Sequence, residues 1–95
     1  MIKVMIERRI IEELEEPYRQ ASKQTLSHAS KAPGFITGES LQDCHKPNHH
    51  YVISLWRSEA YWNKWLNSEV RRESASQLRH LLEEDERFTL LQPTS

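Results

Sequence analysis

The sequence predicts an α+β fold in which two helices cover one face of an antiparallel sheet. Stretches that alternate apolar and polar residues, as half-buried strands do, occur four times in the 95-residue chain. Stretches in which apolar residues recur every three or four positions, as on one face of a helix, occur twice. Together they give the order strand, helix, strand, strand, helix, strand. That order is typical of a sheet with both helices on the same side.

The first strand is predicted over residues 2–10. One side of it carries aliphatic residues at every second position except one, where Arg8 stands. A buried guanidinium is costly unless it is paired or reaches water. Two interpretations remain open. Arg8 forms an ion pair with a carboxylate such as Glu39 on the second strand, or it points into a solvated cleft and holds an anionic or oxygen-rich ligand.

The first helix is predicted within residues 12–34. Acidic residues cluster at its start, Pro17 suits its first turn, and Pro33 followed by Gly34 ends it. Its apolar face is thin and includes Tyr18, so we expect this helix to pack lightly against the sheet.

The second and third strands are predicted over residues 35–43 and 50–56, joined by the turn "CHKPNHH". Gly38, inside the second strand, indicates a bulge or a close approach by another group. The third strand is the most apolar of the four and carries large side chains on both sides, with His50 and Trp56 on one and Tyr51 on the other.

The second helical stretch follows Ser58, a good N-cap. Trp62 and Trp65 are three positions apart and share a face toward the sheet. They pack the core, or Trp65 also lines a cleft. Asn67 and Ser68 interrupt the helix, and "ERFTLLQ" predicts a last short strand before a tail at 92–95.

These elements make a ferredoxin-like βαββαβ subunit. Its helices can cover only one face of the sheet, yet the first strand carries Met5 outside its aliphatic side, and the third strand is apolar on both sides. A monomer seldom exposes such a face to water. We therefore expect a symmetric homodimer in which two sheets face each other.

Composition excludes several classes of function. The formal net charge of -1, from 13 basic and 14 acidic residues, gives no reason to expect nucleic acid or an anionic membrane as a partner. No apolar run is long enough for a membrane helix, and Met1 leads directly into an alternating pattern rather than a secretory signal. Cys44 is the only cysteine, which is typical of a reducing cytoplasm. We expect one cytoplasmic domain over residues 1–95.

Two stretches, "APGFITGESL" and "YVISLWRSEAYWNKWLNSEV", resemble the antibiotic biosynthesis monooxygenase-like (ABM) domains. The shared pattern is a Pro-Gly-Phe start of the second strand, a tryptophan at the end of the third, a Ser-Glu-Ala helix start and a Trp-Leu pair one turn later. The resemblance spans nearly the whole chain and implies a dimeric α+β barrel built from ferredoxin-like subunits. The family includes cofactor-independent oxygenases acting on quinols and polyketides, haem-degrading enzymes, aldehyde-processing proteins and members with no known reaction.

The segment "WLNSEV" is similar to the haem-degrading branch of that family, and Trp65 matches its functional tryptophan. In that branch, an iron-ligating histidine stands ten residues after the tryptophan, where this chain has Ala75. The branch also has an asparagine in the first strand, where this chain has Arg8. His80 lies about 140° around the helix from position 75. Haem iron needs a His, Cys, Met or Tyr ligand, so haem degradation is disfavoured.

The resemblance places ligands in a cleft between helix and sheet, and six residues are candidates for it. Arg8 would stabilise an anion, His50 or His49 would be the general base, Trp65 would form a wall, and Tyr61 and Tyr18 would donate hydrogen bonds. Each also has a structural interpretation: an ion pair for the arginine, a solvated turn for the histidines and core packing for the aromatic residues.

No cofactor is expected. The histidines and the cysteine of the turn form no recognised metal-binding spacing, and nothing indicates a flavin or nicotinamide site. The sequence therefore predicts a cofactor-independent monooxygenase, or a related small-molecule enzyme, acting on a quinol-like or other electron-rich aromatic substrate. The alternative is a non-catalytic dimer that binds a ligand or serves as a structural module.

Overall fold

The predicted ferredoxin-like architecture is confirmed. The computed structural model describes all 95 residues. The elements in chain order are β1 (Ile2–Arg9), α1 (Glu15–Ala29), β2 (Phe35–Gln42), β3 (His49–Trp56), α2 (Glu59–Leu66), α3 (Glu69–Arg79) and β4 (Arg87–Leu91). The strands form one antiparallel sheet in the order β2-β3-β1-β4.

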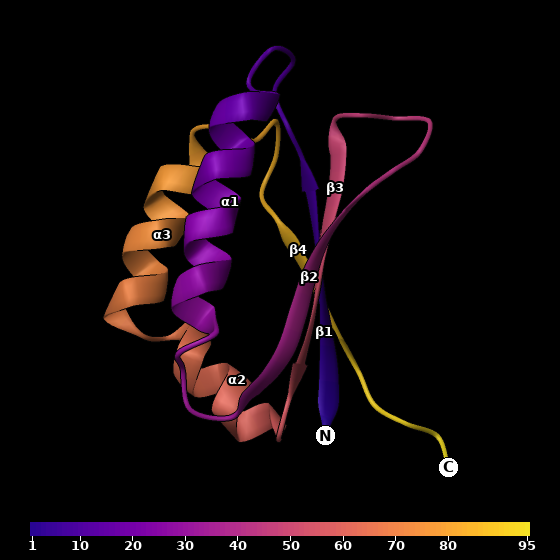
Figure 1. The fold of residues 1–95 in the computed structure, drawn as a ribbon, viewed down its shortest axis with the longest axis vertical. Coiled ribbons are helices and arrows are strands. Elements are labelled where there is room, and N and C mark those ends of the chain that lie inside the picture. The colour runs from indigo at the N-terminus through magenta and orange to yellow at the C-terminus, as the bar shows by residue number, and fades with distance from the viewer.

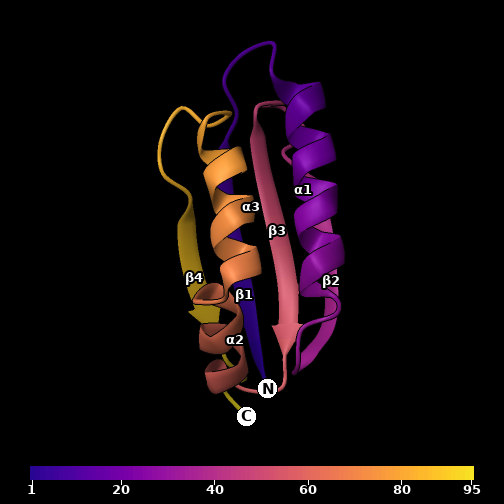
Figure 2. The ribbon, with the colours of Figure 1, turned by 90° about the vertical axis from the view of Figure 1, so that its left-hand side faces the viewer.

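The helices form a single layer on one face of the sheet (Figure 1). Seen from the helix side, α3 lies over β1 and α1 lies over the β3–β2 half, with the two helices side by side (Figure 2). The second helical stretch is divided at Asn67 and Ser68, as the sequence predicts, because Ser68 caps α3 by accepting a hydrogen bond from the amide of Arg71 at 3.2 Å. No helix is both long and apolar enough to span a bilayer.

The alternation of side chains along β1 and β3 separates a buried face from an open one. Val4, Ile6 and Arg8 of β1 are buried beneath the helices, as are alternate residues of β3 from His50 to Trp56. Arg8 therefore lies among apolar side chains on the helix side, as its sequence position indicates. Glu39 is opposite Ile53 in the register and belongs to the other face, so the suggested Arg8–Glu39 ion pair is wrong.

All three tryptophans lie in the core. Trp56 ends β3 with no exposed surface, and its Nε1 donates to Oγ of Ser54 at 2.9 Å. Trp62 and Trp65 press α2 against it, with ring centroids 5.7 Å and 6.5 Å from that of Trp56. The tryptophan cluster therefore holds the sharp α2 corner onto the end of the sheet.

Gly38 is the site of a close approach rather than of the bulge. The register shift of β2 falls between Phe35 and Thr37. A Cβ atom on Gly38 would lie 2.8 Å from Cδ1 of Leu26, so α1 approaches β2 closely only because this position lacks a side chain.

The face of the sheet away from the helices has an apolar centre, with charged residues such as Lys3, Glu7 and Arg87 around it. The apolar residues on it that are half-buried or exposed within one subunit are Met5, Leu41, Tyr51, Ile53, Leu55 and Leu91. No helix covers this face (Figure 1). It is the surface for which the sequence predicts a second copy of the sheet.

Candidate functional site

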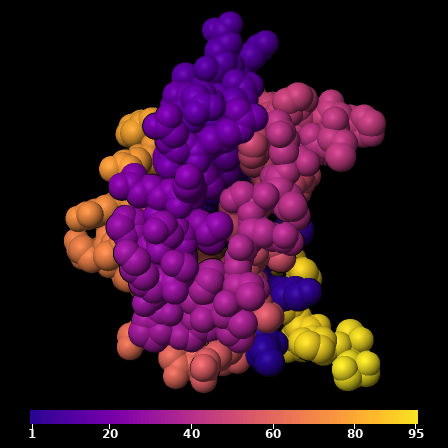
Figure 3. All heavy atoms as spheres, viewed as in Figure 1, coloured from indigo at the N-terminus to yellow at the C-terminus, as the bar shows by residue number.

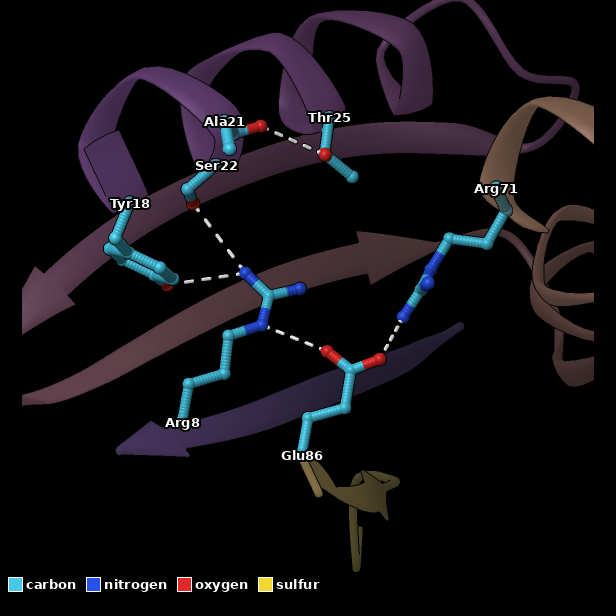
Figure 4. Close-up of polar contacts among 7 residues, drawn as sticks. All are labelled: Arg8, Tyr18, Ala21, Ser22, Thr25, Arg71 and Glu86. Carbon is cyan, nitrogen blue, oxygen red and sulfur yellow. Dashed lines mark hydrogen bonds and ion pairs between the residues drawn. The ribbon is translucent and has the colours of Figure 1, made fainter. Parts of the chain in front are cut away.

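Arg8 is at the centre of a buried polar network. Its residue exposure is only 4%. Nε donates to Oε2 of Glu86 at 2.8 Å, and Nη1 donates to the hydroxyl of Tyr18 at 3.2 Å and to that of Ser22 at 3.5 Å. Figure 4 shows the guanidinium between α1 and the start of β4. A buried cation of this kind is tolerated because each of these partners stabilises its charge.

Glu86 joins two arginines from opposite sides. Its second carboxylate oxygen accepts from Nη2 of Arg71, which comes from α3 and is 3% exposed (Figure 4). Burial alone would raise the pKa of Glu86, but the charges of Arg8 and Arg71 outweigh it and hold that pKa below its ordinary value. Burial also opposes the charge on Arg8, but Tyr18 and Glu86 overcome it and raise the pKa of Arg8. The network is therefore ionised at neutral pH.

A groove of about 670 Å³ runs between α1 and β2, and we refer to it as the α1–β2 groove. Residues that line it include Tyr18, Ser22, Leu26, Gly38, Gln42 and His50. On the side of the molecule seen in Figure 3, the atoms of α1 and β2 meet and the surface between them is hollowed. Arg19 and Lys23 also line the groove and bring positive charge to its α1 wall.

The hydroxyls of Tyr18 and Ser22 connect the groove to Arg8. Each accepts a hydrogen bond from Nη1 of Arg8, and each keeps its own O–H free to donate. A cation that donates to a hydroxyl makes that hydroxyl a stronger donor to the next group. Two polarised donors therefore adjoin the groove, an arrangement suited to a developing oxyanion.

His50 is buried on the helix side of β3 and lines the same groove. Its Nε2 lies 3.0 Å from the carbonyl oxygen of Pro47. A carbonyl can only accept, so Nε2 carries the proton of the neutral ring and Nδ1 holds the lone pair. Burial lowers the pKa of His50, which keeps the ring neutral at neutral pH. Its ring meets that of Tyr18 edge-on, with centroids 4.8 Å apart.

The other sequence candidates lie elsewhere. His49 is half-buried and alternates with His50 along β3, so it belongs to the opposite face. Tyr61 is 40% exposed and packs over Gly34, where a Cβ atom would lie 2.3 Å from its Cγ. Trp65 is buried in the core and does not line the groove. The structure thus brings together Arg8, Tyr18 and His50 at the groove and leaves His49, Tyr61 and Trp65 outside it.

Three residues of the network were not singled out by the sequence interpretation. Ser22 lies on the same helical face as Tyr18, four positions on, and this spacing could have identified it. Arg71 belongs to the polar stretch "RRESASQLRH", in which no local feature marks one arginine for burial. Glu86 follows three further acidic residues, and nothing local distinguishes it from Glu84, whose side chain is 55% exposed.

The interior does not fit a haem. The space enclosed among Trp65, Arg8 and the sheet is about 30 Å³, far less than a porphyrin requires. Position 75 is an alanine without a donor atom, and His80 is exposed at the end of α3. No three His, Cys, Asp or Glu side chains converge as metal ligands would.

The chain is similar to one known protein family and to several solved structures. A family model described as antibiotic biosynthesis monooxygenase matches residues 1–77. The solved structure of an antibiotic biosynthesis monooxygenase is 16% identical with a TM-score of 0.91, covering 100% of both chains. SnoaB, a cofactor-independent oxygenase from Streptomyces nogalater, is 17% identical with a TM-score of 0.86, covering 99% of this chain and 94% of its own.

A conserved protein from Methanosarcina mazei Go1 is 16% identical with a TM-score of 0.89, covering 96% of this chain and 90% of its own. No curated protein matches the sequence. At these identities, the structural likenesses establish the fold alone.

Proposed function

Because the chain belongs to the antibiotic biosynthesis monooxygenase family, we propose that it is a cofactor-independent oxygenase acting on a quinol-like or other electron-rich aromatic substrate in the α1–β2 groove. The observation that carries this proposal is the convergence of a buried, neutral His50 with the Arg8-polarised hydroxyls of Tyr18 and Ser22 at one groove. A groove of about 670 Å³ is within the range of small-molecule sites.

The first step in the proposed reaction is removal of a proton from a substrate hydroxyl. Nδ1 of His50 accepts this proton, since Nε2 is held by the Pro47 carbonyl. The resulting oxyanion receives hydrogen bonds from Tyr18 and Ser22, and the positive charge of Arg8 stabilises it through them. Arg8 is therefore a positioning residue, because it acts on the substrate through the two hydroxyls.

The substrate anion then supplies the electrons for oxygen. It transfers one electron to dioxygen, and the substrate radical and superoxide combine to form a carbon–oxygen bond. Loss of the hydrogen on that carbon, with cleavage of the oxygen–oxygen bond, releases water. The overall balance is quinol plus dioxygen to hydroxylated quinone plus water. One oxygen atom enters the product and the other is reduced, with no further reductant.

A non-catalytic ligand-binding module is the second candidate. It is favoured by the ion pair of Arg8 with Glu86, and by the small volume of about 30 Å³ left among Trp65, Arg8 and the sheet. In this case, the α1–β2 groove would hold a small hydroxylated or anionic ligand that leaves unchanged. Both candidates use the same groove, and they differ only in whether the bound ligand is chemically converted.

We also propose that the active form is a homodimer. Met5, Ile53 and Leu55 lie in the middle of the sheet face that no helix covers. Face-to-face packing of two such sheets would remove this apolar surface from water in both copies. SnoaB shares the fold of the subunit, which is compatible with such a barrel.

Oxygen uptake with a panel of quinols tests the proposed reaction. The wild type should accelerate uptake over buffer, and His50→Gln should lower kcat by on the order of 10²–10⁴. Tyr18→Phe should lower it by on the order of 10²–10³, as loss of an oxyanion donor does. Tyr61→Phe, the same change at an exposed tyrosine outside the groove, is the matched control. If the wild type binds a quinol without consuming oxygen, the non-catalytic candidate holds.

A further inference from the structure

A second, much smaller hollow lies behind the α1–β2 groove, and we refer to it as the inner chamber. Its volume is about 30 Å³. Its apolar walls include Ile6, Val52, Trp56, Trp62 and Trp65. That volume is about one water molecule's share of the liquid, so the chamber admits only a very small guest.

Two buried cations border the inner chamber. Arg8 and Arg71 both line it, and their exposures are 4% and 3%. They share a single carboxylate, that of Glu86, so two positive charges and one negative charge leave a formal excess of +1 (Figure 4). No acidic residue lines the chamber itself. An excess buried charge favours a small counter-ion of opposite sign.

Hydrogen-bond donors are also left over around this space. The chain's side-chain hydrogen bonds use Nε and Nη1 of Arg8 but only Nη2 of Arg71, and they do not use Nε1 of Trp62 or Trp65. No fully buried side-chain nitrogen lacks a partner, so these remaining donors must border accessible space. All four residues line the inner chamber.

We infer that the inner chamber binds dioxygen and holds it as it is reduced to superoxide, an inference that rests on the proposed oxygenase function. The apolar walls suit neutral dioxygen, and the excess positive charge of Arg8 and Arg71 suits the superoxide anion. Ser22 and Leu26 line both the inner chamber and the α1–β2 groove, so the two spaces adjoin. The electron passes from the substrate anion in the groove to dioxygen, and the radical and superoxide then form the carbon–oxygen bond.

Bromide, a small monoanion with an anomalous X-ray signal, is the probe for this site. Crystals of the wild type grown with bromide should show it between Arg8 and Arg71. In solution, bromide should raise the KM for dioxygen without raising the KM for the quinol. Glu86→Gln changes the local excess from +1 to +2, and should tighten bromide binding on the order of tenfold.

Two further variants separate the chamber's charge from its volume. Arg71→Gln removes the excess charge and should abolish bromide binding, while Arg72→Gln, at the neighbouring arginine whose side chain is 72% exposed, should not. Ala29→Val adds two methyl groups to a residue that lines the chamber, and should weaken bromide without changing the charge. Circular dichroism and bromide-dependent thermal melts confirm folding and report binding for each variant.

Each outcome has one interpretation. Absence of bromide from the inner chamber of folded wild-type protein overturns the inference, even if quinol oxidation is observed. Bromide bound there without any effect on the KM for dioxygen overturns the dioxygen assignment. Bromide bound there in a protein that oxidises no quinol shows that the proposed function has failed while the anion site stands.

Discussion

Buried Arg8 forms an ion pair with half-buried Glu86, with Nε and Oε2 2.8 Å apart, although 78 residues separate them in the chain. The pair ties β1 to the beginning of β4 and holds Nη1 of Arg8 against Tyr18 and Ser22. Glu86 lies beyond residues 1–77, the part that the family model matches. The carboxylate that holds Arg8 in place at the candidate site thus comes from the C-terminal segment of this chain.

Loss of the carboxylate should be more costly than loss of an exposed one. Glu86→Gln leaves two buried cations without their shared partner, and should lower the free energy of unfolding by about 3–5 kcal/mol. Glu84→Gln removes an exposed ion pair with Arg9, and should cost about 0–1 kcal/mol. Urea denaturation of the three proteins measures both. Equal losses would show that the buried network contributes nothing beyond a surface pair.

Stability should fall in two stages on acidification. The pKa of His50 is lowered in the folded state, so the unfolded chain binds its proton first, and stability declines as the pH falls below the ordinary value of 6.5. The pKa of Glu86 is also lowered, so its contribution is present above 4.5 and is lost as the pH falls through its folded pKa.

A pH series of unfolding free energies checks the first stage. His50→Gln should flatten the decline just below pH 6.5 and leave the more acidic stage in place. His45→Gln, at an exposed histidine of the preceding turn, should leave both stages unchanged. A His50→Gln curve parallel to that of the wild type would mean that burial does not disfavour the charged ring.

The open face of the sheet should control assembly. Ile53→Lys places a charge at the centre of the predicted dimer interface, and should convert the dimer to monomers at micromolar concentration. Val70→Lys makes a similar change on α3, at a valine that is 44% exposed on the helix side, and should leave the dimer intact. Sedimentation velocity distinguishes the two. A wild type that sediments as a stable monomer would refute the dimer.

Gly34 should not tolerate a side chain. Its φ of 85° is left-handed, and a Cβ atom would collide with the ring of Tyr61 at 2.3 Å. The conformation alone costs roughly 1–2 kcal/mol for other residues, and the collision adds to it. Thermal unfolding should show a larger loss for Gly34→Ala in the wild type than in a Tyr61→Ala background. Equal losses in both backgrounds would assign the whole effect to the backbone.

The fold could be predicted closely because its signals are local. The alternation in β1 and β3, the turn residues, and the break at Asn67 and Ser68 each depend on a few neighbouring residues. Even the burial of Arg8 could be predicted, since a period of two places it beside Val4 and Ile6.

The partners of the candidate site were harder to predict, because pairing across the fold depends on packing. Glu39 was a plausible partner for Arg8 until the register of β2 placed it on the other face. Glu86 and Arg71 stand in charged stretches, and Arg71 is buried and Glu86 half-buried only when α3 and β4 close over β1. The α1–β2 groove likewise depends on how α1 packs against β2. Gly38 indicates a bulge or a close approach, but does not identify α1 as the approaching element.

Oxygen-isotope labelling tests the proposed chemistry most directly. Wild-type protein supplied with a quinol under ¹⁸O₂, without any added cofactor, should form a hydroxylated quinone that carries one labelled oxygen atom, with the other recovered in water. If the folded protein yields only unlabelled quinone and hydrogen peroxide at the rate of buffer alone, the oxygenase assignment is contradicted.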